Sequence, residues 1–156
     1  MAGHELREDA RMGRREEAYA ALLEALSAVT GGPSEPLCVV NEQKTFSGRM
    51  WAVVTTDDAL WFVPLSRKLV PEGTPRRAVP GDIVKASVDG GGGGWVTASM
   101  ILADMTSIKL KLEFADGEKH GFLMMRGDGL GAMMSGASQT EGVNALLTWL
   151  ERARPA

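Results

Sequence analysis

The feature that most constrains the fold is a series of short apolar runs, each bounded by turn residues, between residues 37 and 125. SIKLKLEF at 107–114 alternates apolar with charged residues, the pattern of a strand with one buried face. ADGE follows it, and an Asp-Gly pair at this place is a strong hairpin signal. Runs of this kind predict seven strands, at 37–42, 49–56, 59–66, 82–88, 96–103, 107–114 and 118–125.

No strand-helix-strand alternation separates these runs, so an antiparallel sheet is expected rather than a parallel one. A helix is predicted after the last run, because Ser138 followed by Glu141 is a capping-box pattern. Its apolar stripe consists of Val143, Leu146, Leu147 and Leu150. The order predicts a mainly β protein: a seven-stranded antiparallel barrel or sandwich closed by a C-terminal helix at about 139–152.

A further helix is predicted before the strands. From residue 14 to residue 29 apolar side chains recur every three or four positions, at Tyr19, Leu22, Leu23, Leu26 and Val29. TGGPSEP then ends this helix, since its glycines suit a C-terminal cap and its prolines cannot continue a helix. The chain therefore divides into a flexible lead-in (1–13), a helix with its linker (14–36), and a strand-rich domain with the C-terminal helix (37–156).

Composition narrows the class of protein. A net charge of −3 lacks the basic excess of general nucleic-acid binding. The single cysteine, Cys38, forbids an intramolecular disulfide and is expected to be a small buried side chain of the first strand. The first residues are charged where a signal peptide would be apolar, and no apolar stretch is long enough to cross a membrane. We therefore expect a cytoplasmic protein with no transmembrane segment.

Seven strands and a closing helix resemble the pleckstrin-homology-like (PH-like) superfold, in particular its bacterial members. The similar stretches are WAVVTTDDALWFVPL, VPGDIVKASV, LKLEFADGEKHGFLM and GVNALLTWLERA. The resemblance covers residues 37–152, although Asp57 and Asp58 stand where the family often has an arginine-containing turn. It implies a binding or assembly module, because members bind lipid headgroups, peptides or other proteins and are rarely enzymes by themselves.

Basic residues are concentrated in two loops of the predicted barrel. The residues are Lys44, Arg49, Arg67, Lys68, Arg76 and Arg77. In the PH-like family the loop between the first two strands commonly holds phosphorylated headgroups. If both loops open at the same barrel end, the resemblance implies that the six residues bind an anionic lipid or headgroup. The alternative is a solvated basic loop that keeps an acidic protein soluble.

Catalytic and cofactor sites are not indicated. Of the two histidines, His4 lies in the lead-in and His120 in a strand, neither beside a nucleophile. Histidine and cysteine do not cluster with metal-ligand spacing, so no metal and no cofactor is predicted. The glycine run at 90–94 lacks the Gly-Lys-Ser/Thr ending of a phosphate-binding loop and predicts a mobile connection between strands.

An RGD tripeptide, a group of methionines and one strand edge are further candidates for binding sites. RGD at 126–128 is a coincidence in a chain without a secretion signal. Four methionines, Met124, Met125, Met133 and Met134, either fill the core under the C-terminal helix or form an adaptable peptide-binding surface. The edge between the fifth predicted strand and the C-terminal helix is where a peptide could add as an extra strand.

The leading prediction is a non-enzymatic binding or assembly module whose partner is a protein or further copies of the chain. In this reading the N-terminal helix docks on its own barrel or on a neighbouring subunit. Peripheral binding of an anionic lipid or phosphorylated headgroup through the six basic residues is the alternative. A small-ligand carrier or an enzyme that uses the barrel mouth is a third class.

Overall fold

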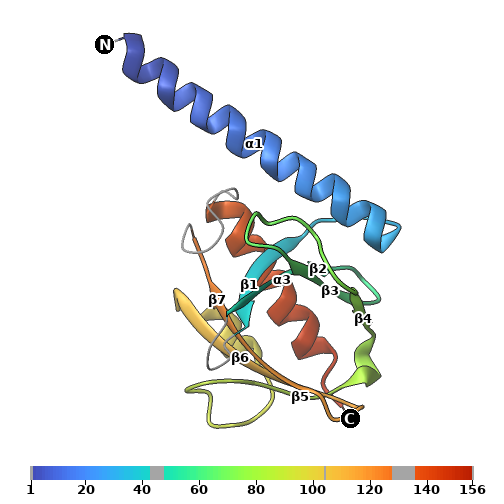
Figure 1. Cartoon of the computed structure of the whole chain (residues 1–156). Coiled ribbons are helices and arrows are strands. Elements are labelled where there is room, and N and C mark those ends of the chain that lie inside the picture. Colours follow the sequence, from blue (N-terminus) through green and yellow to red (C-terminus); the bar gives the residue numbers. More distant parts are fainter. Residues whose placement is uncertain (1, 43–47, 104, 128–135, 156) are drawn as a thin grey trace.

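The computed structural model describes residues 2–42, 48–103, 105–127 and 136–155. It is mainly β, with seven antiparallel strands in one sheet that curls into a half-barrel, and with a helix at its C-terminal end (Figure 1). The strands are β1 Leu37–Glu42, β2 Arg49–Thr55, β3 Leu60–Leu65, β4 Arg76–Ala78, β5 Ile83–Val88, β6 Ser107–Phe114 and β7 Lys119–Met125. The helices are α1 Ala2–Thr30, α2 Ala98–Leu102 and α3 Gly136–Arg152, and a 3-10 turn at Pro80–Asp82 leads into β5.

The sheet has the strand order β4-β3-β2-β1-β7-β6-β5. The antiparallel arrangement, six of the seven predicted strands and the C-terminal helix are confirmed, and β1 and β6 have the predicted bounds. The expected β6–β7 hairpin is also present, with Gly117 at the left-handed φ of 93° that its turn requires.

The predicted strand at 96–103 is wrong, because this segment contains the short helix α2. An apolar run of this length does not distinguish a strand from a buried helix by its periodicity. The free edge of β5 is already occupied where the run begins, since the N–H of Val96 donates to the carbonyl of Ala86 at 2.9 Å. Helical backbone then places Met100 against the core.

β4 is the strand that the sequence did not predict. It comprises three residues at the edge of the sheet, in a stretch interpreted as loop. It pairs with β3, where Ala78 lies opposite Leu60 and Arg76 opposite Phe62. Three residues are too few to show the alternation by which the other strands could be recognised.

The main core lies between the concave face of the sheet and α3. Three phenylalanine rings from β3, β6 and β7 meet there: Phe62 is 5.8 Å from Phe114 and 5.9 Å from Phe122. The apolar stripe predicted for α3 is buried in the same cluster. Strands at the two sides of the sheet thus share one core, which stabilises the curl.

α3 packs where β1 and β7 diverge. These two strands pair at Asn41 and Glu42, whereas nearer the start of β1 the side chain of Gln139 bonds to both. Gln139 accepts a hydrogen bond from the N–H of Val39 at 3.0 Å and donates to the carbonyls of Val39 and Met125 at 2.9 and 3.1 Å. A helix side chain therefore satisfies backbone groups that a neighbouring strand would otherwise bind.

A second core lies on the opposite face of β1, β2 and β3, under the C-terminal part of α1. Leu22 and Leu26 are buried there against side chains of the three strands. The apolar stripe of α1 thus lies on the half-barrel of its own chain. Gly31 follows the helix with a φ of 72° and bonds back to the carbonyl of Ser27, as expected of a glycine cap. Residues 2–13, for which the sequence predicts a flexible lead-in, form the first turns of α1.

Candidate functional site

A buried carboxylate and a histidine face each other at the end of the half-barrel where β1 ends and β7 begins. Oε1 of Glu42 lies 2.7 Å from Nδ1 of His120, and Oε2 of Glu42 accepts a hydrogen bond from the indole N–H of Trp51 at 2.8 Å. Glu42 is 2% exposed. Nδ1 of His120 and the indole N–H of Trp51 thus contact the two oxygens of one buried carboxyl group.

Aromatic rings fix the imidazole from several sides. His120 stacks on Phe122 with the ring centres 5.7 Å apart, and its ring meets the edges of Phe114 and Trp51. Its Nε2 lies 3.6 Å from a carboxylate oxygen of Glu118. In the described part of the chain these partners are carboxylates and rings, without a hydroxyl or thiol nucleophile at hydrogen-bond distance. The pair connects β1 to β7 and orders this end of the half-barrel.

The sequence analysis did not identify the pairing of Glu42 with His120. A signal was nevertheless present, because Glu42 alternates with Cys38 and Val40 on the core face of β1. A carboxylate at such a position needs a donor in the core.

Arg76 is one of the six basic residues proposed to bind an anion, and it has partners within the chain. Its guanidinium donates to Asp116 at 3.0 Å and to Glu118, and it lies 3.7 Å above the ring of Phe114. The backbone N–H of Glu118, together with Arg76, lowers the pKa of the Asp116 carboxyl. These contacts connect β4 to the β6–β7 turn across the opening of the curled sheet.

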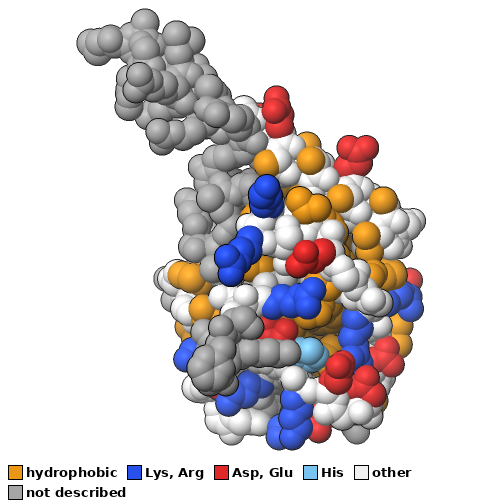
Figure 2. Space-filling view, in the orientation of Figure 1, with side chains coloured by type: hydrophobic (Ala, Val, Ile, Leu, Met, Phe, Trp, Pro, Cys, Tyr) orange, Lys and Arg blue, Asp and Glu red, His pale blue; other side chains and the backbone are white. Residues whose placement is uncertain are grey.

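Of the other predicted basic residues that the structure describes, three lie near one another and Arg77 lies apart on β4. Arg49, which lies over the ring of Trp51, is at the same end of the β2–β3 hairpin as Arg67 and Lys68. Arg77 points to the face of β4 opposite that of Arg76, as adjacent strand residues do. Lys44 lies outside the described residues. In the space-filling view, Lys and Arg side chains are mixed with Asp and Glu (Figure 2).

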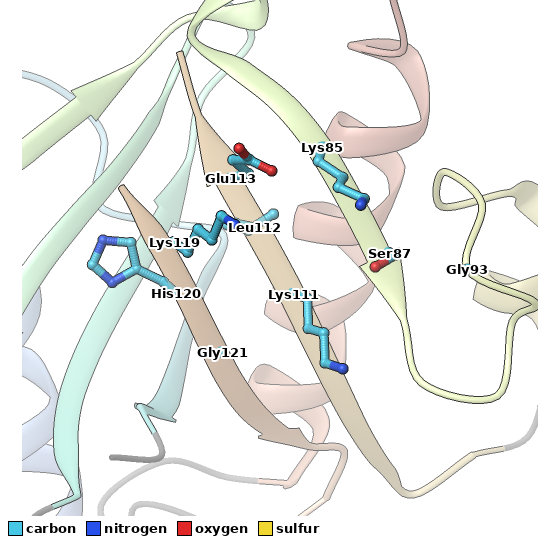
Figure 3. A pocket seen from close by; sticks show the side chains of 9 residues that line it. All are labelled: Lys85, Ser87, Gly93, Lys111, Leu112, Glu113, Lys119, His120 and Gly121. Carbon is cyan, nitrogen blue, oxygen red and sulfur yellow. The ribbon is translucent and has the colours of Figure 1, made fainter. Parts of the chain in front are cut away.

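A pocket of about 500 Å³ lies on the convex face of β5, β6 and β7, away from the six residues above. We call it the lysine pocket, because Lys85, Lys111 and Lys119 line it together with Ser87, Glu113 and Gly93 (Figure 3). Each of the three strands contributes one lysine, and Gly93 belongs to the glycine run that follows β5. These lysines have no distinctive sequence pattern, because each lies in a different strand and they meet only in the folded sheet.

The glycine run forms a compact reversal after β5. Gly90, Gly92 and Gly93 have φ values between 78° and 88°, which other residues rarely adopt. The chain then returns along β5, where Trp95 bridges to Ser87 and donates its indole N–H to the carbonyl of Leu150 at 2.7 Å. The run therefore lets Trp95 reach one of the last carbonyls of α3.

Cys38 is fully buried in the main core, and burial raises the pKa of its thiol to about 12. This agrees with the predicted small buried side chain. No group of three or more His, Cys, Asp or Glu residues is placed to hold a metal ion within the ranges the structure describes.

Arg126, from the RGD tripeptide, holds α2 in place. Its guanidinium donates to the carbonyls of Ile101, Ala103 and Met105 at 2.8 to 2.9 Å, and to the side chain of Asn144 on α3 at 3.0 Å. Asp128 lies outside the described residues. An arginine engaged in this way has a structural role between α2 and α3.

The methionines divide between described and undescribed positions. Met124 is fully buried in the main core, as the core-filling interpretation requires, and Met125 is half-buried. Met133 and Met134 lie outside the described residues. The peptide-binding edge predicted beside the fifth strand is wrong in its placement, because residues 98–102 of that segment form α2 and offer no strand edge.

No protein-family model matches the chain, and no curated protein matches it. Among the helices that the structure describes, none is long and apolar enough to cross a membrane.

Proposed function

We propose that the chain is a non-enzymatic assembly module, in which a PH-like half-barrel associates with a second copy through the N-terminal part of α1. The order of seven antiparallel strands followed by a helix supports the PH-like assignment. The observation that carries the assembly function is the length of α1 relative to the surface on which it packs.

α1 has 29 residues and would be about 44 Å long at 1.5 Å per residue. The strands beneath its C-terminal part have six or seven residues, which span roughly 20 to 24 Å. The N-terminal part of α1 consequently extends beyond the half-barrel (Figure 1). A helical segment without packing is marginally stable in water, so a partner surface along it would add stability.

The charges along this segment are self-complementary. Acidic residues predominate first and basic residues next: Glu5, Glu8 and Asp9, with Arg7 among them, precede Arg11, Arg14 and Arg15, and Glu16 and Glu17 follow. If two copies of α1 pair antiparallel about position 10, positions 5 and 9 of one copy lie opposite positions 15 and 11 of the other. Such a contact is isologous, the usual arrangement of a symmetric dimer. A second copy is therefore the partner that this segment fits best.

A charge-swap experiment tests the proposal. One variant changes Glu5, Glu8 and Asp9 to Arg, and the other changes Arg11, Arg14 and Arg15 to Glu. By light scattering after size exclusion, the native chain should be a dimer that weakens with added salt, because salt screens the attraction between opposite charges. Each variant alone should be monomeric, and an equimolar mixture should form dimers again.

The matched control is Glu24→Arg, an exposed position on the part of α1 that covers the sheet. It should leave the dimer unchanged. A monomeric native chain at high protein concentration would refute self-association. A dimer that survives both charge reversals would place the interface elsewhere on the molecule.

A further inference from the structure

The convex face of the sheet is covered by α1 over β1, β2 and β3, whereas over β5, β6 and β7 it carries lysines. Register fixes their positions: Lys85 of β5 lies opposite Glu113 of β6, which lies opposite Lys119 of β7. In the same way Ser87 lies opposite Lys111, which lies opposite Gly121. Two neighbouring rows across three strands thus carry the lysines, Ser87 and Glu113 of the lysine pocket, and His120, opposite Leu112, also lines it (Figure 3).

The size of the lysine pocket suits a small ligand or a headgroup. Its volume of about 500 Å³ falls in the range of roughly 300 to 1,000 Å³ typical of ligand pockets. The floor is the sheet, and Gly93 of the glycine run lines one side (Figure 3). The left-handed φ of 80° at Gly93 belongs to the turn that brings this loop back beside β5.

The charge balance of the pocket is positive in a protein whose net charge is −3. Its lining has three lysines and one glutamate, which leaves an excess of two positive charges. Lys111 has an exposed ion pair with Asp89 at 3.3 Å. Lys85 and Lys119 make no ion pair with the residues that the structure describes, so their ammonium groups are available to an anion.

Ser87 supplies a second, independent observation. It is only 9% exposed and lines the pocket between Lys85 and Lys111. The structure gives its hydroxyl no hydrogen bond to any described residue. A nearly buried hydroxyl beside unpaired ammonium groups is a donor that a bound oxyanion can use.

We infer that the lysine pocket binds a phosphate group, carried either by a small soluble molecule or by a lipid headgroup. Lysine ammonium groups act as point charges on phosphate and approach it from several directions, as the three strands place them here. Glu113 opposes binding, since its carboxylate lies between Lys85 and Lys119 in the register. The site is separate from α1 and does not depend on the assembly proposed above.

Two binding arms distinguish the sources of the phosphate. In the first, pyrophosphate is titrated into the isotope-labelled full chain, and shifts are followed at the amides of Lys85, Ser87, Gly93, Lys111 and Lys119. In the second, the protein is sedimented with phosphatidylcholine vesicles that contain or lack phosphatidic acid. Saturable shifts at these amides, or sedimentation that requires phosphatidic acid, are the expected results. Shifts alone identify a soluble ligand, and sedimentation identifies a headgroup.

Variants of opposite sign make the test specific. Lys85→Gln combined with Lys119→Gln should weaken binding of the phosphate group at least about tenfold. The double change removes the attraction of two cations for the anion, and each cation adds to the binding free energy. Glu113→Gln should strengthen binding by about two- to threefold, because it removes the opposing charge. All three positions lie on the solvent side of the sheet, and near-ultraviolet circular dichroism confirms that each variant is folded.

The control variant is Arg67→Gln combined with Lys68→Gln, which removes two exposed cations from the β3–β4 turn. It should leave both binding arms unchanged. If phosphate binding is lost in this control but kept in the Lys85, Lys119 variant, the inference is overturned. The anion site would then lie at the loop that contains Arg67 and Lys68. Absence of binding in both arms would overturn it as well.

Discussion

Glu42 and His120 are 78 positions apart in the chain, yet Oε1 of Glu42 lies 2.7 Å from Nδ1 of His120. The contact exists because the end of β1 pairs with the middle of β7, with Glu42 directly opposite Phe122. The carboxylate is nearly inaccessible to water, and the indole of Trp51 binds its second oxygen. A buried carboxylate of this kind makes the free energy of unfolding depend on each of its donors.

His120→Phe should therefore destabilise the protein although it preserves an aromatic ring beside Phe122. It removes a donor to Glu42 and leaves the buried charge less well bound, which should lower the free energy of unfolding by about 3 kcal/mol. Urea denaturation measures the loss. The double variant with Glu42→Gln should recover part of it, because an amide carries no charge. A single variant as stable as the native chain would contradict the role assigned to the pair.

The positions of six strands could be predicted from the sequence, because every strand except β4 carries its own signal. The alternation in β6 shows which residues face the core and which face solvent, and Lys111 and Glu113 are indeed on the solvent side. β1 and β2 contain continuous apolar runs instead, a pattern typical of strands buried on both faces. That signal agrees with α1 covering one face and the main core filling the other.

Contacts between distant strands could not be predicted in the same way. The alternation in β1 and β7 places Glu42 and His120 on the core face, but their meeting depends on a pairing between the first and last strands. The lysine pocket depends likewise on the register among β5, β6 and β7. Of the six basic residues, Arg76 and Arg77 point to opposite faces because they lie in β4, which has no sequence signal of its own.

Two glycine-to-alanine changes in helices should have opposite effects. At Gly142 in α3, an added Cβ would lie 2.0 Å from the carbonyl oxygen of Leu37, so the helix must shift from β1. Gly142→Ala should lower the free energy of unfolding by at least about 2 kcal/mol. Gly13→Ala in α1 meets nothing within 4 Å and should stabilise the chain by up to about 1 kcal/mol.

Thermal and urea denaturation measure both glycine changes. Helix propensity favours alanine at each position, so a loss confined to Gly142→Ala isolates the contact with β1. If Gly142→Ala and Gly13→Ala change the free energy of unfolding equally, the close packing of α3 against β1 at Gly142 is contradicted. No change at Gly13 would indicate that the start of the chain is a flexible lead-in rather than helix.

Arg126→Ala should loosen α2 without unfolding the half-barrel. The side chain donates to the carbonyls of Ile101, Ala103 and Met105, and none of these bonds belongs to the sheet. Hydrogen exchange should accelerate by about tenfold or more in residues 98–105, given about 1.4 kcal/mol or more for charged hydrogen bonds lost together. Exchange in β6 should be unchanged, as it should be everywhere in the exposed control Arg154→Ala. Uniform acceleration across the chain would instead assign Arg126 to global stability.

Cys38 should make the protein less stable at alkaline pH. Burial raises the pKa of its thiol from an ordinary value of 9.0 to about 12 in the folded chain. Between these values the unfolded chain loses the thiol proton while the folded chain keeps it, so the free energy of unfolding falls as pH rises, by up to about 1.4 kcal/mol per pH unit. Below pH 9 this contribution is fully present.

Urea denaturation at pH 8, 9, 10 and 11 tests the Cys38 prediction, with Cys38→Ala as the reference. The alanine variant is less stable at every pH because of the cavity it leaves, but its stability should fall less steeply above pH 9. A thiol reagent at pH 8 should label native Cys38 at the rate at which the core opens and label the urea-unfolded chain at once. Parallel pH profiles for the two proteins, or rapid labelling of the native chain, would show that the thiol is accessible to water.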